Sequence, residues 1–312
     1  MNAQTNTRKK LAGIIMVTLC ATIWGTAFIA QSLGSAYNDP FTFNCSRSIL
    51  ATAFLLFCCF IRDKLAGRHF TVLGTDEPIT KDRLIKGGIV CGISLALGTY
   101  LQQLGVMYTT VGKSGFITTL YIVIVPLLNY LVTRRPVTIL QGAGVALAVV
   151  GMYFICIKEG FSVNKGDIYV LLCAFCFAAQ IICVDNIIRN LDGLHLSLIT
   201  FATGSVFNGI FMFIFEEPAL ENILAALGPI AYAGIMSNGV AYTLQMMGQK
   251  YINPVLASMI MSLESPVALL SGWVILGQAM DGREIFGCVL VFAAIMLAQI
   301  PDKYLSRETK TS

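Results

Sequence analysis

Ten apolar runs divide this 312-residue chain, and each is long enough to cross a lipid bilayer as a helix. A helix needs roughly 20 mostly apolar residues to span about 30 Å of hydrocarbon. In lipid, every backbone polar group must be hydrogen-bonded within the protein, so the runs predict an all-α, polytopic membrane protein with ten transmembrane helices. They lie at about residues 11–33, 41–62, 84–106, 110–132, 138–158, 166–188, 195–215, 223–246, 254–276 and 283–301.

The composition excludes a water-soluble globule. Hydrophobic residues make up 56% of the chain and charged residues 12%, and the mean hydropathy is +0.75. Soluble domains carry roughly 25% charged residues, so a chain with half that share cannot cover its surface with polar groups. The ten cysteines all fall in apolar runs, where small side chains pack between helices. They predict no disulfide framework and no metal site.

Lys and Arg are concentrated in alternate connections between the runs. With the N-terminus in the cytoplasm, the inner segments hold 16 of the 21 basic residues, the outer segments hold 4, and Arg47 lies within a span. Cytoplasmic loops of membrane proteins carry an excess of Lys and Arg. The chain is therefore predicted to be a multi-pass protein of the plasma (bacterial inner) membrane with both termini in the cytoplasm.

Two stretches of the chain align at a shift of 143 residues. YLQQLGVMYTTVGKSGFITTLY begins at Tyr100, and TLQMMGQKYINPVLASMIMSLE begins at Thr243. Each half then contains five spans, and an odd number turns the second half upside down in the membrane. Residues 1–158 and 159–312 are therefore predicted to be two inverted five-helix repeats, the alternative being a chance similarity of apolar helices. Inverted repeats in transporters place a binding site near the midplane, between the halves.

Four segments carry a resemblance to a known family. IWGTAF, PFTFNCSRSIL, YTTVGKSGFITTLYIVIVP and AYTLQMMGQKYINPVLASMIMSLESPVALLSGWVILGQ resemble the EamA-like branch of the drug/metabolite transporter superfamily, over about residues 11–301. The resemblance implies a carrier of small organic solutes, frequently an exporter of amino acids or related metabolites. An acidic residue common after the family's fourth and ninth spans is replaced here by Arg135 and Gln278, so no ion pair of these loops is carried over.

One short motif points to a different class of protein. Gly112-Lys113-Ser114 is the tail of a phosphate-binding loop, but Met107 stands where that loop needs Gly, and an apolar run follows. We interpret it as the outer start of the fourth span. His69 and His195 show no metal spacing, and the soluble segments are too short for a catalytic domain. We predict no cofactor, no nucleic-acid partner and no enzymatic activity.

Glu264 is the most informative single position. It lies near the middle of the ninth span, where a carboxylate must face a cavity or a partner, or take up a proton. Pro266 removes one backbone hydrogen bond and is predicted to bend the helix there. Glu264 is a candidate contact for a substrate amine or a proton acceptor, the structural alternative being a Glu bonded to a neighbouring helix. Its repeat counterpart is Tyr121, also at mid-depth.

Other polar and aromatic residues within the spans are candidates for the transport path. Arg47 could bind a substrate carboxylate, pair with a carboxylate or helix C-terminus, or extend to the interface. Trp24 is too deep for the interfacial aromatic belt and is a candidate cavity wall. The inversion places further polar groups at matching depths, to line the path or to join helices: Gln102, Gln103 and Gln245, with Asn238, Tyr242, Ser262 and Tyr100 as a weaker class.

Together these features predict a secondary transporter that moves small organic metabolites, such as amino acids or related solutes, by alternating access, in the direction of export. Its partners are a small-molecule substrate, membrane lipids and, where Glu264 couples transport, protons. The alternatives are a passive facilitator and a non-transporting integral membrane protein, such as a lipid-modifying enzyme or a sensor subunit.

Overall fold

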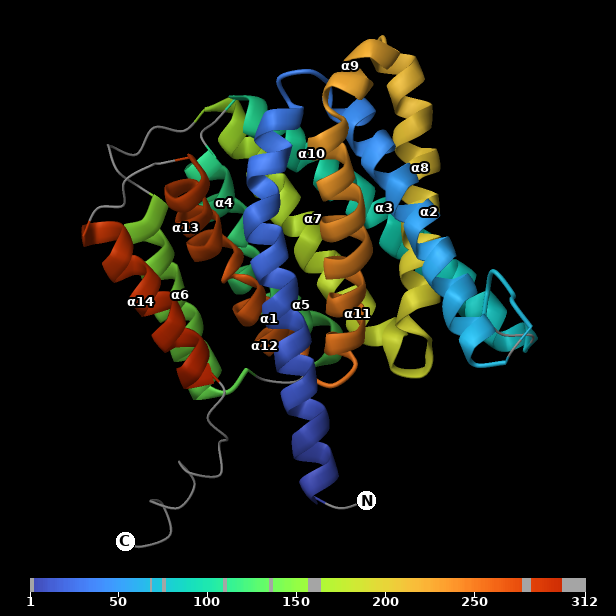
Figure 1. The fold of residues 1–312 in the computed structure, drawn as a ribbon. Helices are drawn as coiled ribbons and strands as arrows, with labels where there is room; N and C mark the ends of the chain where they lie inside the picture. The colour runs from blue at the N-terminus through green and yellow to red at the C-terminus, as the bar shows by residue number, and fades with distance from the viewer. Residues whose placement is uncertain are drawn as a thin grey trace, which may run out of the picture.

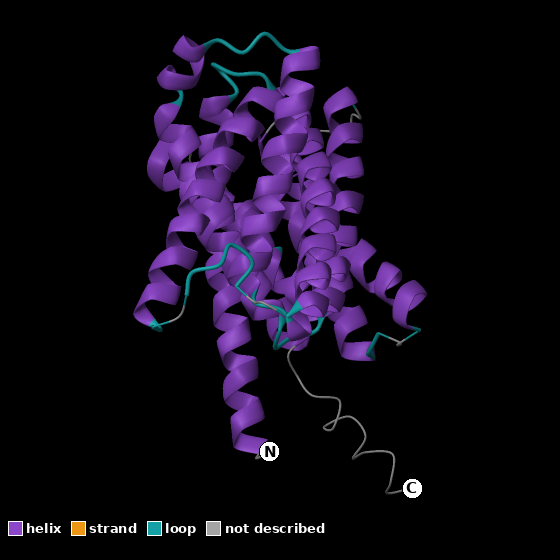
Figure 2. Ribbon diagram, turned by 90° about the vertical axis from the view of Figure 1, so that its right-hand side faces the viewer, coloured by secondary structure: helices purple, strands orange, loops and turns teal. Residues whose placement is uncertain are grey.

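The regular elements of the described chain are all helical (Figure 2). The computed structural model describes residues 3–67, 69–74, 77–108, 111–134, 137–156, 164–276 and 282–298. The elements of the first half are α1 (Ala3–Gly34), α2 (Pro40–Leu65), α3 (Pro78–Tyr108), α4 (Val111–Thr119), α5 (Tyr121–Thr133) and α6 (Ile139–Cys156). Those of the second half are α7 (Lys165–Ile187), η1 (Ile188–Asn190), α8 (Gly193–Phe215), α9 (Leu220–Ala225), α10 (Leu227–Ala231), η2 (Tyr232–Ala241), α11 (Tyr242–Gln249), α12 (Pro254–Met261), α13 (Glu264–Leu276) and α14 (Gly282–Ala298).

The lengths and hydropathies of these helices are those of a polytopic membrane protein. Within the described residues, six helical stretches are long and apolar enough to cross a bilayer: Thr7–Gly34, Pro40–Leu65, Pro78–Tyr108, Lys165–Ile187, Gly193–Phe215 and Pro254–Ile275. Three shorter apolar stretches accompany them: Ile117–Thr133, Ile139–Gly151 and Ile285–Leu297. Each apolar run of the sequence coincides with a helix, or with consecutive helices, wherever its residues are described.

The ninth run is broken directly before Glu264. α12 ends at Met261 and α13 begins at Glu264, which places Pro266 in the first turn of α13. A proline is tolerated there because the first backbone N–H groups of a helix have no intrahelical partner. At the break, the Ser265 N–H donates to the Ser262 carbonyl at 3.2 Å. The predicted bend is confirmed, and it puts the Glu264 carboxylate at the positive end of α13.

The eighth run contains a π-helix, η2, instead of a continuous α-helix. π-Helical turns are rare and are frequently found at functional sites. Two glycines allow η2 to lie directly against α2. A Cβ atom on Gly234 would lie 2.8 Å from the Arg47 carbonyl oxygen, and one on Gly239 would lie 2.6 Å from Phe54 Cδ1. The backbone of η2 is therefore pressed against the helix that carries Arg47.

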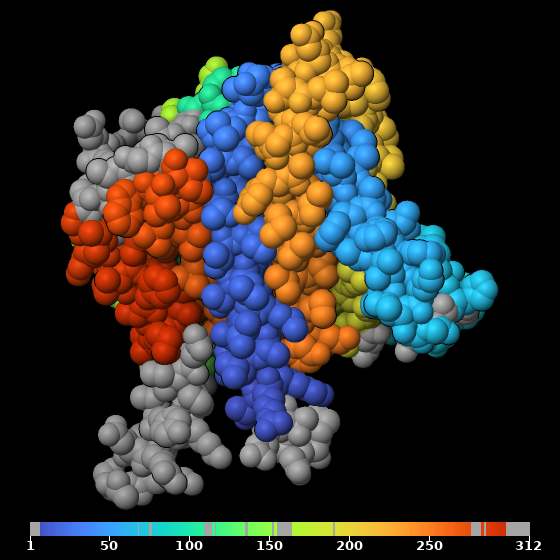
Figure 3. All heavy atoms as spheres, in the orientation of Figure 1, coloured from blue at the N-terminus to red at the C-terminus, as the bar shows by residue number. Residues whose placement is uncertain are grey.

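The first helix of each half packs mainly on the other half. α1 lies against α10, η2, α11, α12 and α13, and Figure 3 shows it between the helices of the second half. In the same way, α7 packs mainly against α3, α4 and α5. Two further pairs, α2 with α8 and α6 with α14, join helices that occupy equivalent places in the two halves. The halves are thus interleaved along their whole contact.

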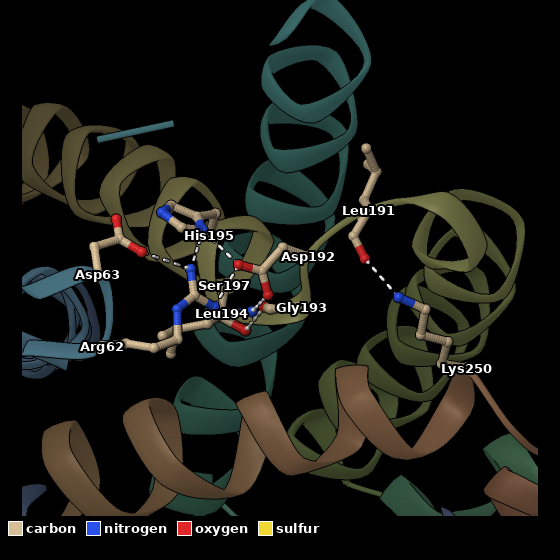
Figure 4. A network of polar contacts seen from close by, with 9 residues as sticks. All are labelled: Arg62, Asp63, Leu191, Asp192, Gly193, Leu194, His195, Ser197 and Lys250. Atoms are coloured by element: carbon tan, nitrogen blue, oxygen red, sulfur yellow. Dashed lines mark hydrogen bonds and ion pairs between the residues drawn. The ribbon is translucent and has the colours of Figure 1, made fainter. Parts of the chain in front are cut away.

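The pair of α2 and α8 is held by hydrogen bonds at both ends. We call the side where α1 begins and α14 ends the terminal face (Figure 1), and the other side the opposite face. At the opposite face, Glu216 accepts bonds from the backbone N–H groups of Phe41 at 2.8 Å and Thr42 at 2.7 Å. At the terminal face, Arg62 Nη1 lies 2.5 Å from Asp192 Oδ2 (Figure 4). We call these contacts the opposite tie and the terminal tie.

His195 completes the terminal tie. Its Nδ1 lies 2.5 Å from Asp192 Oδ2 and 3.0 Å from Arg62 Nη2. Nearby, Lys250 Nζ donates to the Leu191 carbonyl at 3.0 Å (Figure 4). Burial acts to raise the pKa of Asp192, but the bonds to His195 and Arg62 outweigh it and lower that pKa to about 2.

Asp192→Asn should lower the melting temperature of the purified protein in detergent. A lowered carboxyl pKa contributes stability that is present above its ordinary value of 3.8 and is lost as the pH falls through about 2. The variant should therefore melt below wild type throughout the range from about pH 8 to pH 5. Asp82→Asn is the matched control, since it removes an exposed pair with Lys86 (2.8 Å) that contributes little. If Asp192→Asn and wild type melt at the same temperature at pH 5, the terminal tie does not stabilise the folded protein.

Candidate functional site

A cavity of about 60 Å³ lies in the interior, between helices of both halves. A water needs roughly 10–15 Å³ of such space, so the cavity holds on the order of five waters or a solute of similar size. Eight of the eleven residues named as site candidates in the sequence line this cavity: Trp24, Arg47, Gln102, Tyr121, Asn238, Tyr242, Gln245 and Glu264. Reasoning from depth and polarity thus selected side chains that the fold brings together.

Glu264 and Tyr121 meet across the two halves. The Tyr121 hydroxyl donates to Glu264 Oε1 at 3.1 Å, and both side chains are buried. Each is the first residue of its helix, α13 or α5. A buried carboxylate in this setting has one neutral hydrogen-bond donor, so it can accept a further donor, such as an ammonium group, or a proton.

Arg47 is buried in the wall of the same cavity, with 3% of its surface exposed. Its guanidinium lies 5.4 Å from the centroid of the Phe43 ring. Within the described residues, no carboxylate lies within salt-bridge distance of Arg47. Extension to the membrane interface, one of the roles expected from sequence, does not agree with this burial. A buried guanidinium presents five N–H donors in a planar fork, which suits a carboxylate.

Trp24 joins α1 to the π-helix. Its indole Nε1 donates to the Ser237 carbonyl at 3.1 Å, and one face of the ring borders the cavity. Two residues further along α1, the Thr26 hydroxyl shares a hydrogen bond with the Tyr232 hydroxyl at 2.5 Å. Trp24 therefore serves as a cavity wall and also positions η2.

A chain of amides connects α7 to α11 at the cavity. Gln180 Nε2 donates to the Tyr242 hydroxyl at 2.8 Å, and Gln245 Nε2 lies 3.4 Å from Gln180 Oε1. Gln180 was missed in the sequence, although a lone Gln in the middle of the apolar run FAAQIIC carries the same signal as Gln102. Other lining residues had no distinguishing signal, because they are aromatic or apolar residues in apolar runs: Phe28, Leu95, Phe177, Phe201 and Met261.

The other three candidates, Gln103, Tyr100 and Ser262, are not among the residues that line the cavity. Gln103 Nε2 donates to Ser35 Oγ at 2.6 Å and joins α3 to α1. Tyr100 stacks on Phe41 with ring centroids 3.9 Å apart, near the opposite face. The Ser262 hydroxyl donates to the Met259 carbonyl at 2.7 Å, within its own helix turn. Asp185, near the end of α7, is buried and lies 3.2 Å from Arg189 Nη2. Arg135 and Gln278 lie outside the described residues, as does the side chain of Lys113.

A second, larger cavity opens near the terminal face. This vestibule has a volume of about 440 Å³ and is lined mostly by polar residues from both halves: Asn129, Thr133, Val137, Thr138 and Gln141 from the first, and Asp185, Asn186, Arg189, Asn253, Pro254 and Val255 from the second. Along α5, α7 and α12, the residues between those that line the two cavities include buried side chains of one apolar cluster, which we call the plug: Ile122, Val125, Ile182, Leu256 and Ile260.

The central cavity shows the features of a small-molecule binding site. Among the described residues, no group of three or more His, Cys, Asp or Glu side chains is placed to hold a metal ion. The polar groups of the cavity are instead one carboxylate, one guanidinium, amides and hydroxyls, set among aromatic rings. A few placed polar groups in an apolar, concave wall are typical of small-molecule sites.

Comparison with known proteins assigns the chain to a family. The sequence profile of the EamA-like transporter family matches twice, at residues 11–157 and 164–299. An uncharacterized transporter of Archaeoglobus fulgidus is 28% identical over 292 residues, which cover 94% of this chain and 87% of that protein. A crystal structure superposes with a TM-score of 0.75 at 14% identity, covering 99% of this chain and 100% of the other, and this likeness shows the fold alone. The two profile matches span most of the chain, and it therefore belongs to the EamA-like transporter family of the drug/metabolite transporter superfamily, as a multi-pass membrane transporter and not an enzyme.

Proposed function

We infer that this protein is a secondary carrier that exports small zwitterionic metabolites, such as amino acids or related solutes, across the plasma membrane by alternating access. The central cavity is the cargo site. One observation supports this most strongly: a buried carboxylate, Glu264, and a buried guanidinium, Arg47, line the same cavity together with aromatic side chains. Opposite charges in a small apolar site match a solute that carries both an ammonium and a carboxylate group.

In this proposal, the parts that move relative to each other are two inverted five-helix repeats, residues 1–158 and 159–312. The boundary between them falls on residues outside those described. Support comes from the contact between Tyr121 and Glu264, which are 143 residues apart, the shift of the repeat. Equivalent residues touch each other only near the axis that relates two halves, as do the equivalent helices α6 and α14. With the ten runs as ten spans and the basic loops inside, both termini lie in the cytoplasm.

Uptake into proteoliposomes tests the proposed cargo. Wild-type protein should accumulate one or more labelled amino acids when a pH gradient is imposed, and empty liposomes should not. Equilibration that ignores the gradient would point to a passive facilitator. An absence of flux for every labelled amino acid and amine tried would remove the support for this class of cargo.

Arg47→Gln should weaken transport of amino acids selectively. A hydrogen bond to a charged group is worth roughly 1.5–3 kcal/mol, so uptake of a cargo that bears a carboxylate should fall tenfold or more. A labelled amine without a carboxylate is the matched probe, and its uptake should change little. If both cargoes lose uptake equally, Arg47 has a structural role, and carboxylate recognition must lie elsewhere.

A further inference from the structure

Two of the seams between the halves differ in how they are joined. One seam is the contact of α2 with α8, and the other runs where α5 meets α7 and α12. A carrier that works by alternating access must open a passage from its central cavity to each face in turn. The contacts within each seam indicate which of the two opens toward the terminal face.

Polar bonds close the α2–α8 seam at three levels. The opposite tie joins the two helices at the opposite face, where the Thr42 hydroxyl donates a third hydrogen bond to Glu216 at 2.7 Å. At mid-height, Thr52 Oγ1 lies 3.3 Å from Ser205 Oγ. The terminal tie of Arg62 and Asp192 joins the lower end (Figure 4). Separating the two helices would break charge-assisted bonds at both ends at once.

The neighbouring helix reinforces this seam. A Cβ atom on Gly92 of α3 would lie 2.7 Å from the Thr200 carbonyl oxygen of α8, so the two backbones are in direct contact. On the other side, Gly234 of η2 lies against the Arg47 backbone of α2. Backbones this close have no space to slide, because packed interiors resist small displacements.

The other seam has a different composition. On α5, the order along the helix is the cavity residue Tyr121, the plug residues Ile122 and Val125, and then the vestibule residue Asn129. On α12 the same order runs backwards from Met261 through Ile260 and Leu256 to Val255. About two turns of apolar side chains are therefore all that separates the cavity from the vestibule along these helices. Apolar contacts are non-directional and can be exchanged for others as helices tilt.

We propose that the passage between the central cavity and the terminal face runs through the vestibule along the α5–α7–α12 seam, and that α2 and α8 stay together as a fixed spine. The vestibule is thus the first polar site that a cargo meets on its way in from this face. The proposal rests on the central cavity as the cargo site, but it concerns the route and not the identity of the cargo.

A labelling experiment without cargo tests the route. Gln102→Cys places a thiol in the central cavity, and a membrane-impermeant thiol reagent is applied to sealed vesicles from either face. Peptide-resolved mass spectrometry separates this thiol from the native cysteines. Asn129→Trp, which fills the vestibule from the first half, should slow labelling from the terminal face at least tenfold and leave labelling from the opposite face unchanged. Asn186→Trp repeats the test from the second half, and Ala66→Trp, on the same face at the end of α2, is the control.

Cross-links test the spine in the same vesicles. Thr52→Cys with Ser205→Cys, whose hydroxyl oxygens lie 3.3 Å apart, and Thr42→Cys with Glu216→Cys, whose side chains meet at 2.7 Å, each bring two thiols together across α2 and α8 for oxidation to a disulfide. Labelling of Gln102→Cys from each face should stay within about twofold of the reduced sample, which serves as its own folding control. The proposal is overturned if either cross-link stops labelling from the terminal face, or if both vestibule substitutions leave it unchanged. Since no cargo is used, these outcomes stand whether or not amino-acid uptake is observed.

Discussion

Glu264→Gln should abolish accumulation driven by a pH gradient in proteoliposomes. The amide keeps the volume of the side chain, but it cannot exchange a proton with the solvent and cannot balance an ammonium group. Loss of a charged contact of roughly 1.5–3 kcal/mol by itself reduces uptake about tenfold to a hundredfold. Loss of proton exchange removes the coupling entirely. Wild type and variant are compared at the same protein density with a labelled amino acid.

Tyr121→Phe is the matched control for this substitution. It removes only the hydroxyl that donates to Glu264 at 3.1 Å and retains the carboxylate. Gradient-driven uptake should therefore persist at a reduced rate. Unchanged accumulation in Glu264→Gln would take the charge of this residue out of the mechanism. Equal flux in all three proteins, with no response to the gradient, would identify a facilitator.

Gly25→Val should destabilise the protein and impair transport together. A Cβ atom at Gly25 would lie 2.6 Å from Val267 Cβ and 2.8 Å from the Glu264 carbonyl oxygen, so α1 and α13 would have to move apart. Overpacking of this kind costs roughly 1–3 kcal/mol. The displacement falls on the first turn of α13, which carries the carboxylate of the site. We expect a lower melting temperature in detergent and uptake reduced more than the loss of folded protein explains.

Gly142→Val provides the comparison for this effect. A Cβ atom at Gly142 would meet no atom within 4 Å, because this glycine lies at the start of α6 with open space beside it. Its valine variant should melt and transport like wild type. If the two valine variants behave alike, the close approach of α1 to α13 is not a constraint on the fold.

The spans and the site residues were predictable for the same physical reason. Water-free surroundings require long apolar helices, and any strongly polar side chain within them then stands out against its background. Glu264, Arg47 and Gln102 stood out in this way, and all three line the central cavity. The bend at Pro266 was predictable because a proline has no N–H to donate.

Other features depend on contacts that a single sequence does not reveal. The π-helix η2 forms where Trp24, more than 200 residues earlier in the chain, donates to the Ser237 carbonyl. The burial of Asp185 depends on how α7 meets the vestibule, which its position at the end of an apolar run does not show. The terminal tie joins Arg62 to Asp192, which are 130 residues apart, and no sequence pattern pairs them.

The exchange of first helices between the halves sets the order in which the molecule can be completed during synthesis. α1 ends at Gly34, but its partners α11 and α13 begin at Tyr242 and Glu264. The helix that enters the bilayer first must therefore wait in lipid until nearly the whole chain has emerged. Contacts between segments so far apart form late and slowly. A first half made alone would lack the partners of its own α1, so the two repeats mature as one unit and not as two successive domains.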